Sequence, residues 1–135
     1  MNTAIIYKID SLITASQLIE IFNDSGIKRP TTDLLRIQQM IDKADLLITA
    51  WHGDLLVGVA RSLTDFVYCC YLSDLAIRKE YQHKGIGKRL IEITKEQISE
   101  QSMLLLLSAP SAMAYYPRLN LFEKVENGFI IKRKK

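Results

Sequence analysis

The sequence predicts an α/β fold in which helices flank a mixed, mostly antiparallel sheet. Two observations predict it. Short apolar segments with strand character alternate with segments whose apolar residues recur every three or four positions, as in amphipathic helices. Three strand-like segments also follow one another between residues 46 and 77 with only tight turns between them, which is typical of an antiparallel meander. The length of 135 residues favours a single domain, residues 1–135.

The N-terminal half is expected to hold four strands and two helices. Thr14 and Gln17 form a capping box that opens the first helix, and Gly26 ends it. Pro30 and Thr31 are expected to open the second helix. The expected strands are Thr3–Ile9, Leu46–Trp51, Leu55–Leu63 and Phe66–Ile77.

The C-terminal half is expected to hold two helices and three strands. A helix runs from Gly85 to about Glu100, a buried strand spans Met103–Ser108, and a short helix runs from Pro110 to about Leu119. Asn127-Gly128 is a strong hairpin signal, so the final two strands are placed at Phe122–Val125 and Phe129–Lys132. The complete expected order is β-α-α-β-β-β-α-β-α-β-β.

Composition excludes several classes of protein. Hydrophobic residues make up 48% and charged residues 24% of the chain, which excludes a disordered or low-complexity protein. The longest apolar run, Phe66–Leu72, is far too short to span a membrane. Adjacent Cys69 and Cys70 do not build a disulfide framework, and no zinc-ligand spacing is present. We therefore expect a cytoplasmic protein with no metal and no membrane partner.

Charge is distributed unevenly along the chain. Residues 1–77 carry six Lys/Arg and nine Asp/Glu, whereas residues 78–135 carry twelve and six. This asymmetry indicates an anionic ligand on the C-terminal half. The basic residues are split between a loop, a helix and the tail, and no recognition helix is evident, so nucleic acid is not the expected partner.

One segment carries the chemistry. Gln82-His-Lys-Gly85-Ile-Gly87 follows a strand and leads directly into a helix. A helix N-terminus presents unpaired N–H groups, and glycines let a phosphate approach the backbone, so a pyrophosphate fits here. The segment lacks the first Gly and the hydroxyl of a P-loop, and it lacks the third Gly of the dinucleotide-binding fingerprint. A simple junction between two caps is the alternative interpretation.

This segment resembles the Gln/Arg-x-x-Gly-x-Gly/Ala signature of the GNAT N-acetyltransferase superfamily. Asp74–Ile77 resembles the fourth strand of that family, and Ala112–Leu121 resembles its Ala-x-x-Phe-Tyr-x-x-x-Gly-Phe motif, with Asn120 and Leu121 in place of Gly and Phe. The resemblance implies the GNAT fold and an acetyl-CoA-dependent N-acetyltransferase. Its acceptor would be the amine of a small molecule or an amino-terminal group. A catalytically weak module that senses acetyl-CoA is the alternative.

The resemblance also implies site residues. Backbone groups of Leu75, Ala76 and Ile77 would pair with the pantetheine arm. Backbone N–H groups would hold the diphosphate at Gln82, His83, Lys84, Gly85, Ile86, Gly87 and Lys88. The side chains of Arg78, Lys79, Lys84 and Lys88 would also offer charge. Tyr116 would be the general acid, with Tyr115 as the alternative in register.

The general base is less defined by the resemblance. Asp74 is one candidate, and a water relay is the other, because Ser73 stands where some relatives carry Glu. The acidic residues Asp24 and Asp33 would suit a cationic amine. A homodimer is possible.

Overall fold

The computed structural model describes residues 4–134 and contains one five-stranded sheet of order β1-β2-β3-β4-β5. The first four strands are antiparallel, and β5 is parallel to β4. The strands are β1 (Ile5–Ile9), β2 (Leu46–His52), β3 (Leu55–Thr64), β4 (Cys69–Ile77) and β5 (Met103–Leu105). The expected mixed and mostly antiparallel sheet is therefore confirmed. Thr3, the first residue of the first expected strand, lies outside the described residues.

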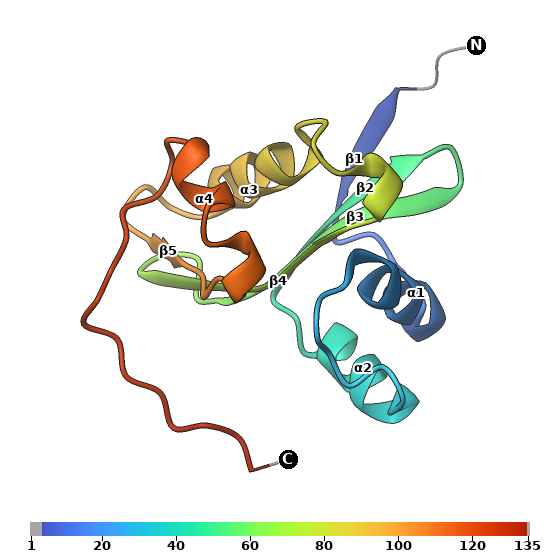
Figure 1. The fold of residues 1–135 in the computed structure, drawn as a ribbon, viewed down its shortest axis with the longest axis horizontal. Coiled ribbons are helices and arrows are strands. Elements are labelled where there is room, and N and C mark those ends of the chain that lie inside the picture. The colour runs from blue at the N-terminus through green and yellow to red at the C-terminus, as the bar shows by residue number, and fades with distance from the viewer. Residues whose placement is uncertain (1–3, 135) are drawn as a thin grey trace.

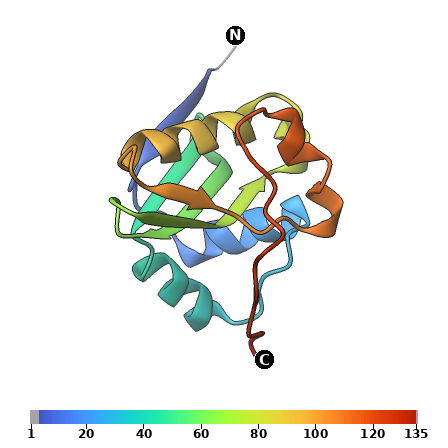
Figure 2. The same ribbon diagram turned by 90° about the vertical axis from the view of Figure 1, so that its left-hand side faces the viewer.

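Helices cover both faces of the sheet (Figure 1). The helices α1 (Ala15–Ser25) and α2 (Leu34–Asp42) lie on one face, where Leu18, Phe22 and Ile37 are buried against strand residues such as Val59. The helix α3 (Ile86–Gln97) lies on the opposite face, and its Leu90 is buried against residues that include Ile48 and Val57. The sheet thus has a hydrophobic core on each face. Figure 2 shows α3 on one side of the sheet and α1 and α2 on the other.

The caps of the first two helices show how local sequence sets their limits. Thr14 and Gln17 form the expected capping box, and Gly26 ends α1 with a left-handed φ of 86°. The prediction that Pro30 and Thr31 open α2 is wrong. The helix begins at Leu34, because the Asp33 side chain accepts a hydrogen bond from the Arg36 N–H at 3.0 Å and so supplies the cap.

The strand β4 begins later than expected. The carboxylate of Asp65 accepts hydrogen bonds from the N–H groups of Val67, Tyr68 and Cys69, so residues 65–68 form a turn. These hydrogen bonds lower the pKa of the Asp65 carboxyl, and the bond from the Cys69 N–H has the largest effect. The following strand β5 is also shorter than the expected Met103–Ser108, and it pairs only with Cys69–Tyr71.

The C-terminal end differs most from the prediction. A 3-10 turn, η2 (Pro110–Ala112), and a short helix, α4 (Tyr115–Arg118), replace the expected single helix. The predicted strands Phe122–Val125 and Phe129–Lys132 are wrong, because no strand forms between residues 121 and 134. This segment leaves α4 and runs clear of the sheet (Figure 1), with Phe129 and Ile131 fully exposed. A two-stranded hairpin is marginal without a neighbouring strand, and the three-residue β5 provides little edge for one.

Within residues 4–134, none of the helices has the length and apolar character that a membrane span requires.

Candidate active site

The segment between β4 and α3 forms a loop with outward-facing backbone donors. A 3-10 turn, η1 (Lys79–Tyr81), leads into it, and α3 starts at Ile86 with Gly85 as its N-cap. The first hydrogen bond of the helix runs from the Arg89 N–H to the Gly85 carbonyl at 3.1 Å, which leaves the preceding helical N–H groups of Ile86, Gly87 and Lys88 without an intrahelical acceptor. The loop therefore presents a set of N–H groups and the positive end of the helix dipole to an anion.

The two glycines of this loop have different roles. Gly85 has a φ of 85°, and a Cβ built on it would meet nothing within 4 Å. Its left-handed backbone needs glycine, and the space in front of it is open. A Cβ built on Gly87 would instead lie 2.5 Å from the Tyr115 hydroxyl oxygen. Gly87 therefore makes room for a tyrosine of α4, a role that the sequence did not reveal.

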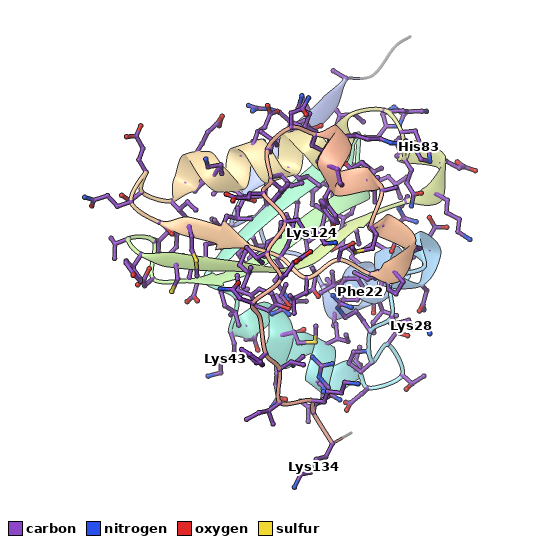
Figure 3. The ribbon with its side chains drawn as sticks, turned by 60° about the vertical axis from the view of Figure 1, so that its left-hand side comes forward. Phe22, Lys28, Lys43, His83, Lys124 and Lys134 are labelled. Carbon is purple, nitrogen blue, oxygen red and sulfur yellow. The ribbon has the colours of Figure 1, made fainter. Side chains whose placement is uncertain are left out.

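Among the other loop residues, Gln82 is hydrogen-bonded within the protein, whereas His83, Lys84 and Lys88 are exposed. The Gln82 N–H donates to the Lys79 carbonyl at 3.2 Å, and its side-chain amide donates to the Ile77 carbonyl at 2.9 Å. Gln82 thus ties the loop to the end of β4. His83 is exposed with a φ of 63° and lies on the outer side of the loop (Figure 3). Lys84 and Lys88 are exposed, and Lys84 lies over the Tyr81 ring at 5.6 Å.

The strand β4 has an open edge beside this loop. We use "open edge" for the main chain of residues 72–77 on the side away from β3. The strand β5 pairs with β4 only as far as Tyr71, so the two strands separate beyond that residue. The register of β4 against β3 also shifts beside Ser73, because Arg61 pairs with Asp74 whereas Ser62 pairs with Leu72.

Strand alternation shows which residues serve the open edge. Hydrogen-bonded and non-hydrogen-bonded residue pairs alternate along two antiparallel strands. The Arg78 N–H donates to the Val57 carbonyl at 2.9 Å, so the next hydrogen-bonded pair is Val59–Ala76. The pairs between and beyond them, Gly58–Ile77 and Ala60–Leu75, are not hydrogen-bonded to each other. The backbone groups of Leu75 and Ile77 consequently point to the open edge, whereas those of Ala76 point to β3. Because the Ile77 carbonyl already accepts the Gln82 amide, the groups on offer are the Leu75 N–H and C=O and the Ile77 N–H.

Two adjacent tyrosines open the short helix α4. The Tyr115 hydroxyl approaches Gly87, and the Tyr116 ring packs edge-on against Phe122 with 5.6 Å between centroids. Burial raises the pKa of both hydroxyls, and Tyr115 raises that of Tyr116 further. Both hydroxyls therefore hold their protons at neutral pH, as a proton donor must.

Asp74 lies in an environment that does not suit a general base. Its side chain has no solvent exposure, and its two carboxylate oxygens accept hydrogen bonds from the guanidinium groups of Arg29 and Arg61. A base must reach the proton that it takes, and here both oxygens are already held inside the protein. These contacts argue against the general-base role predicted for Asp74 and favour a positioning role instead. We call Arg29, Arg61 and Asp74 the charged cluster.

Sequence reasoning missed the two arginines of the charged cluster. They come from the loop after α1 and from β3, 45 and 13 residues from Asp74. No local pattern marks such pairs, because sheet register and the path of the loop bring them together.

The two acidic residues expected to attract a cationic amine are also engaged. The Asp24 carboxylate accepts the Lys79 N–H at 2.8 Å, and Asp33 caps α2. The nearby Arg78 is bound to Glu20 at 2.7 Å and to the Leu56 carbonyl at 2.6 Å, so it turns away from the loop.

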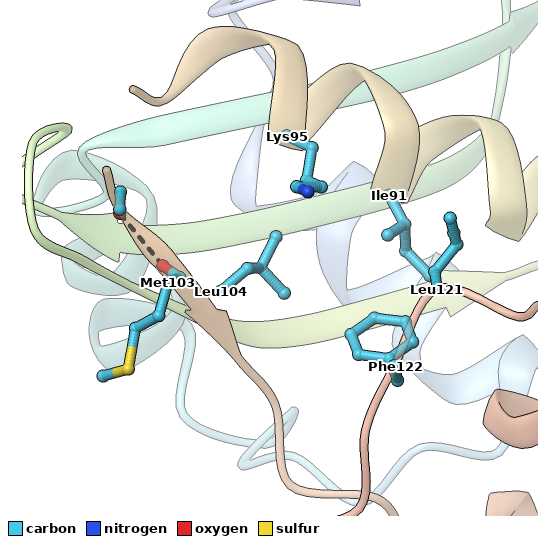
Figure 4. Close-up of a pocket in the computed structure, with 7 residues that line it drawn as sticks. Ile91, Lys95, Met103, Leu104, Leu121 and Phe122 are labelled. Atoms are coloured by element: carbon cyan, nitrogen blue, oxygen red, sulfur yellow. Dashed lines mark hydrogen bonds between the residues drawn. The ribbon is translucent and has the colours of Figure 1, made fainter. Parts of the chain in front are cut away.

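Two further features lie outside the site. A shallow pocket between α3 and β5 is lined by residues that include Ile91, Leu104 and Phe122 (Figure 4). Among residues 4–134 no group of three His, Cys, Asp or Glu side chains could hold a metal ion, and the two cysteines are free.

Comparison with known proteins agrees with this geometry. The family model described as an acetyltransferase (GNAT) domain matches residues 19–129. The chain belongs to the GNAT acetyltransferase family. An uncharacterized ycf52-like N-acetyltransferase of Prochlorococcus marinus is 27% identical over 111 residues, which cover 78% of this chain. The matched region spans only 59% of that relative.

Solved structures of GNAT proteins share the fold. A probable acetyltransferase of unknown function from meticillin-resistant Staphylococcus aureus superposes with a TM-score of 0.79 at 18% identity, covering 96% of this chain and 100% of that one. The aminoglycoside N-acetyltransferase AAC(6')-Iy in complex with CoA superposes with a TM-score of 0.68 at 11% identity, covering 100% of this chain and 98% of that one.

Proposed function

We propose that this GNAT chain is an acetyl-CoA-dependent N-acetyltransferase that transfers the acetyl group directly to an amine. The observation that carries the proposal is the continuity of the open edge of β4 with the loop at the start of α3. The edge offers strand-like hydrogen bonds to an extended arm, and the loop offers N–H groups to a diphosphate. Together they match the two chemically distinct parts of CoA.

The residues that would hold acetyl-CoA follow from this arrangement. The main chain of Leu75 and Ile77 would pair with the pantetheine amides. The N–H groups from His83 to Lys88 would surround the diphosphate, with added charge from Lys84 and Lys88. A main-chain N–H at the open edge would also donate to the thioester oxygen, where negative charge develops during transfer.

The transfer needs two proton movements. Acetyl-CoA supplies an acetyl thioester, which is open to attack by an unprotonated amine. The amine nitrogen forms a bond to the acetyl carbon, the carbon–sulfur bond breaks, and the amine loses a proton to water. We propose that Tyr116 gives its proton to the departing thiolate and regains one from water, so that the products are an N-acetyl amine and CoA. Asp74 would hold the bulge of β4 in place during these steps.

A non-enzymatic acetyl-CoA sensor is the second candidate. The engagement of both Asp74 oxygens favours it, since it leaves the charged cluster without a free carboxylate. Release of free CoA thiol with a panel of amines distinguishes the two functions, because a sensor binds acetyl-CoA without consuming it.

A cytoplasmic location is supported by the free thiols Cys69 and Cys70. The homodimer and the lack of a nucleic-acid partner stay predictions.

Calorimetric titration with acetyl-CoA tests the proposed site. A methyl group at Gly85 would enter the open space where the diphosphate is expected, so Gly85→Ala should weaken binding by about tenfold or more (about 1.4 kcal/mol). Gly53→Ala is the matched control. Gly53 also has a left-handed φ, of 60°, and open space around it, but it lies in the turn between β2 and β3. Equal acetyl-CoA affinity in the two variants would contradict the assignment.

A further inference from the structure

The charged cluster carries an unbalanced positive charge. Two guanidinium groups, of Arg29 and Arg61, share the single carboxylate of Asp74. Arg61 is buried and also donates to the Met40 carbonyl at 3.4 Å and the Ser73 hydroxyl at 3.2 Å. One positive charge of the cluster therefore remains uncompensated, and Asp74 cannot neutralise a further group.

Arg29 is the member of the cluster that reaches solvent. Its side chain is 26% exposed, compared with 9% for Arg61 and 0% for Asp74. It donates one hydrogen bond from each of its three nitrogens: to Asp74, to the Lys28 carbonyl at 2.6 Å and to the Ser73 carbonyl at 2.8 Å. A guanidinium carries five N–H groups, so two donors of Arg29 are left to bind another acceptor.

The position of Arg29 links these donors to the proposed reaction. Arg29 lies in the loop between α1 and α2. Its bond to the Ser73 carbonyl places the guanidinium at the register shift of β4, just beyond the point where β5 separates from β4. In the proposed function, an acceptor amine would reach the thioester at this opening. The carboxylates of Asp24 and Asp33 are held elsewhere, at the start of η1 and at the cap of α2, and neither accepts a hydrogen bond from Arg29.

We propose that the acceptor is an amine that also carries a carboxylate, and that Arg29 binds this carboxylate. The inference rests on the proposed acetyltransferase function and names the class of its acceptor. Arginine suits this task because its planar guanidinium recognises a carboxylate through two parallel N–H bonds, and because its charge does not depend on pH. The rigid hold of Asp74 and Ser73 on Arg29 fixes the direction of the remaining donors before the acceptor arrives.

Matched acid and amide acceptors test this inference. Glycine and glycinamide, β-alanine and β-alaninamide, and lysine and lysinamide are compared as kcat/KM for the unprotonated amine, which removes their difference in amine pKa. In the wild type we expect at least one acid to exceed its amide by about tenfold or more. Arg29→Gln should bring that ratio close to one. Lys28→Gln, which removes an equal charge from the neighbouring exposed residue (Figure 3), should retain the ratio.

The outcomes separate this inference from the function on which it rests. Loss of acetyl-CoA binding in the wild-type protein overturns the proposed function. If acetyl-CoA binds and no acid is acetylated faster than its amide, the inference alone is wrong. A preference for phosphoethanolamine over every acid would also overturn it, since the anion recognised would then be a phosphate. Thermal denaturation of Arg29→Gln verifies that the variant is folded, and Arg29→Lys, which keeps the charge but not the fork, should recover only part of the preference.

Discussion

The two sides of β4 are built by different means. The proposed cofactor side consists of main chain: the open edge of residues 72–77 and the N–H groups of the loop before α3. The proposed acceptor side consists of side chains, those of Arg29, Arg61 and Asp74, which come from three separate elements. The comparison shows that a site made of main-chain groups is determined by one short, continuous segment of sequence. A site made of side chains is determined by tertiary contacts between elements that are distant in the sequence.

This difference predicts that removal of one side chain on the acceptor side affects the whole fold. Asp74→Ala leaves Arg29 and Arg61 facing each other without a counter-ion, with Arg61 buried. Breaking a buried ion pair in this way costs about 3–5 kcal/mol of the free energy of unfolding, measured by urea denaturation. Asp54→Ala, in the exposed turn between β2 and β3, should change it by less than about 0.5 kcal/mol.

The milder Asp74→Asn variant tests the assignment of Asp74 as a positioning residue. It should keep the wild-type pH dependence of kcat/KM between pH 6 and 9, because no proton passes through Asp74. A pH dependence that changes in this variant would restore Asp74 as the general base.

Tyr115 lies beside Gly87 of the loop and Tyr116 is the proposed proton donor, so substitution of these two tyrosines sharpens the comparison. Tyr116→Phe should lower kcat by about tenfold or more with little change in the KM for acetyl-CoA, because only the proton donor is lost. Tyr115→Phe is the matched variant. If Tyr115→Phe is the slow one, the alignment of this helix with the family motif is displaced by one residue.

Within the main-chain site, Gly87 offers a smaller and purely geometric test. A Cβ at Gly87 would lie 2.5 Å from the Tyr115 hydroxyl oxygen but 3.5 Å from Cζ, the next nearest atom. Tyr115→Phe therefore removes the clash, and Gly87→Ala should be better tolerated in that background by about 1 kcal/mol of the free energy of unfolding. The cycle of Gly87→Ala with Tyr116→Phe should be additive, and equal coupling in the two cycles would contradict the position of Tyr115.

Sequence reasoning found those parts of the molecule that local chemistry determines. The capping box at Thr14 and the left-handed Gly26 need only their neighbours along the chain, and the same is true of Gly85 at the start of α3. The hairpin predicted at Asn127-Gly128 also has the right local sequence, but a hairpin needs a third strand beside it, and residues 121–134 have none. Local preference therefore sufficed for the caps at Thr14, Gly26 and Gly85, although it misplaced the start of α2, and it failed where stability comes from a distant partner.

The charged cluster marks the other limit. Asp74 is noticeable in the sequence because it lies on the strand before the loop, but its role depends on Arg29, which is 45 residues away. The role of Gly87 likewise depends on Tyr115 of α4. In both cases the sequence indicates the residue but not its partner, because contacts between elements leave no pattern in a single sequence.

The smallest expected effect concerns stability at high pH, to which both tyrosines of α4 contribute. Burial raises the pKa of Tyr115 and Tyr116 in the folded protein, whereas the pKa of a tyrosine in the unfolded chain is about 10. Their contribution to stability is therefore complete below about pH 10 and is lost as the pH rises from there toward the folded pKa values. The free energy of unfolding of the Tyr115→Phe/Tyr116→Phe double variant should consequently fall less steeply above pH 10 than that of the wild type. Tyr68→Phe, at an exposed position in the turn before β4, should leave the wild-type slope unchanged. Equal slopes in the wild type and the double variant would show that neither hydroxyl is buried in the folded protein.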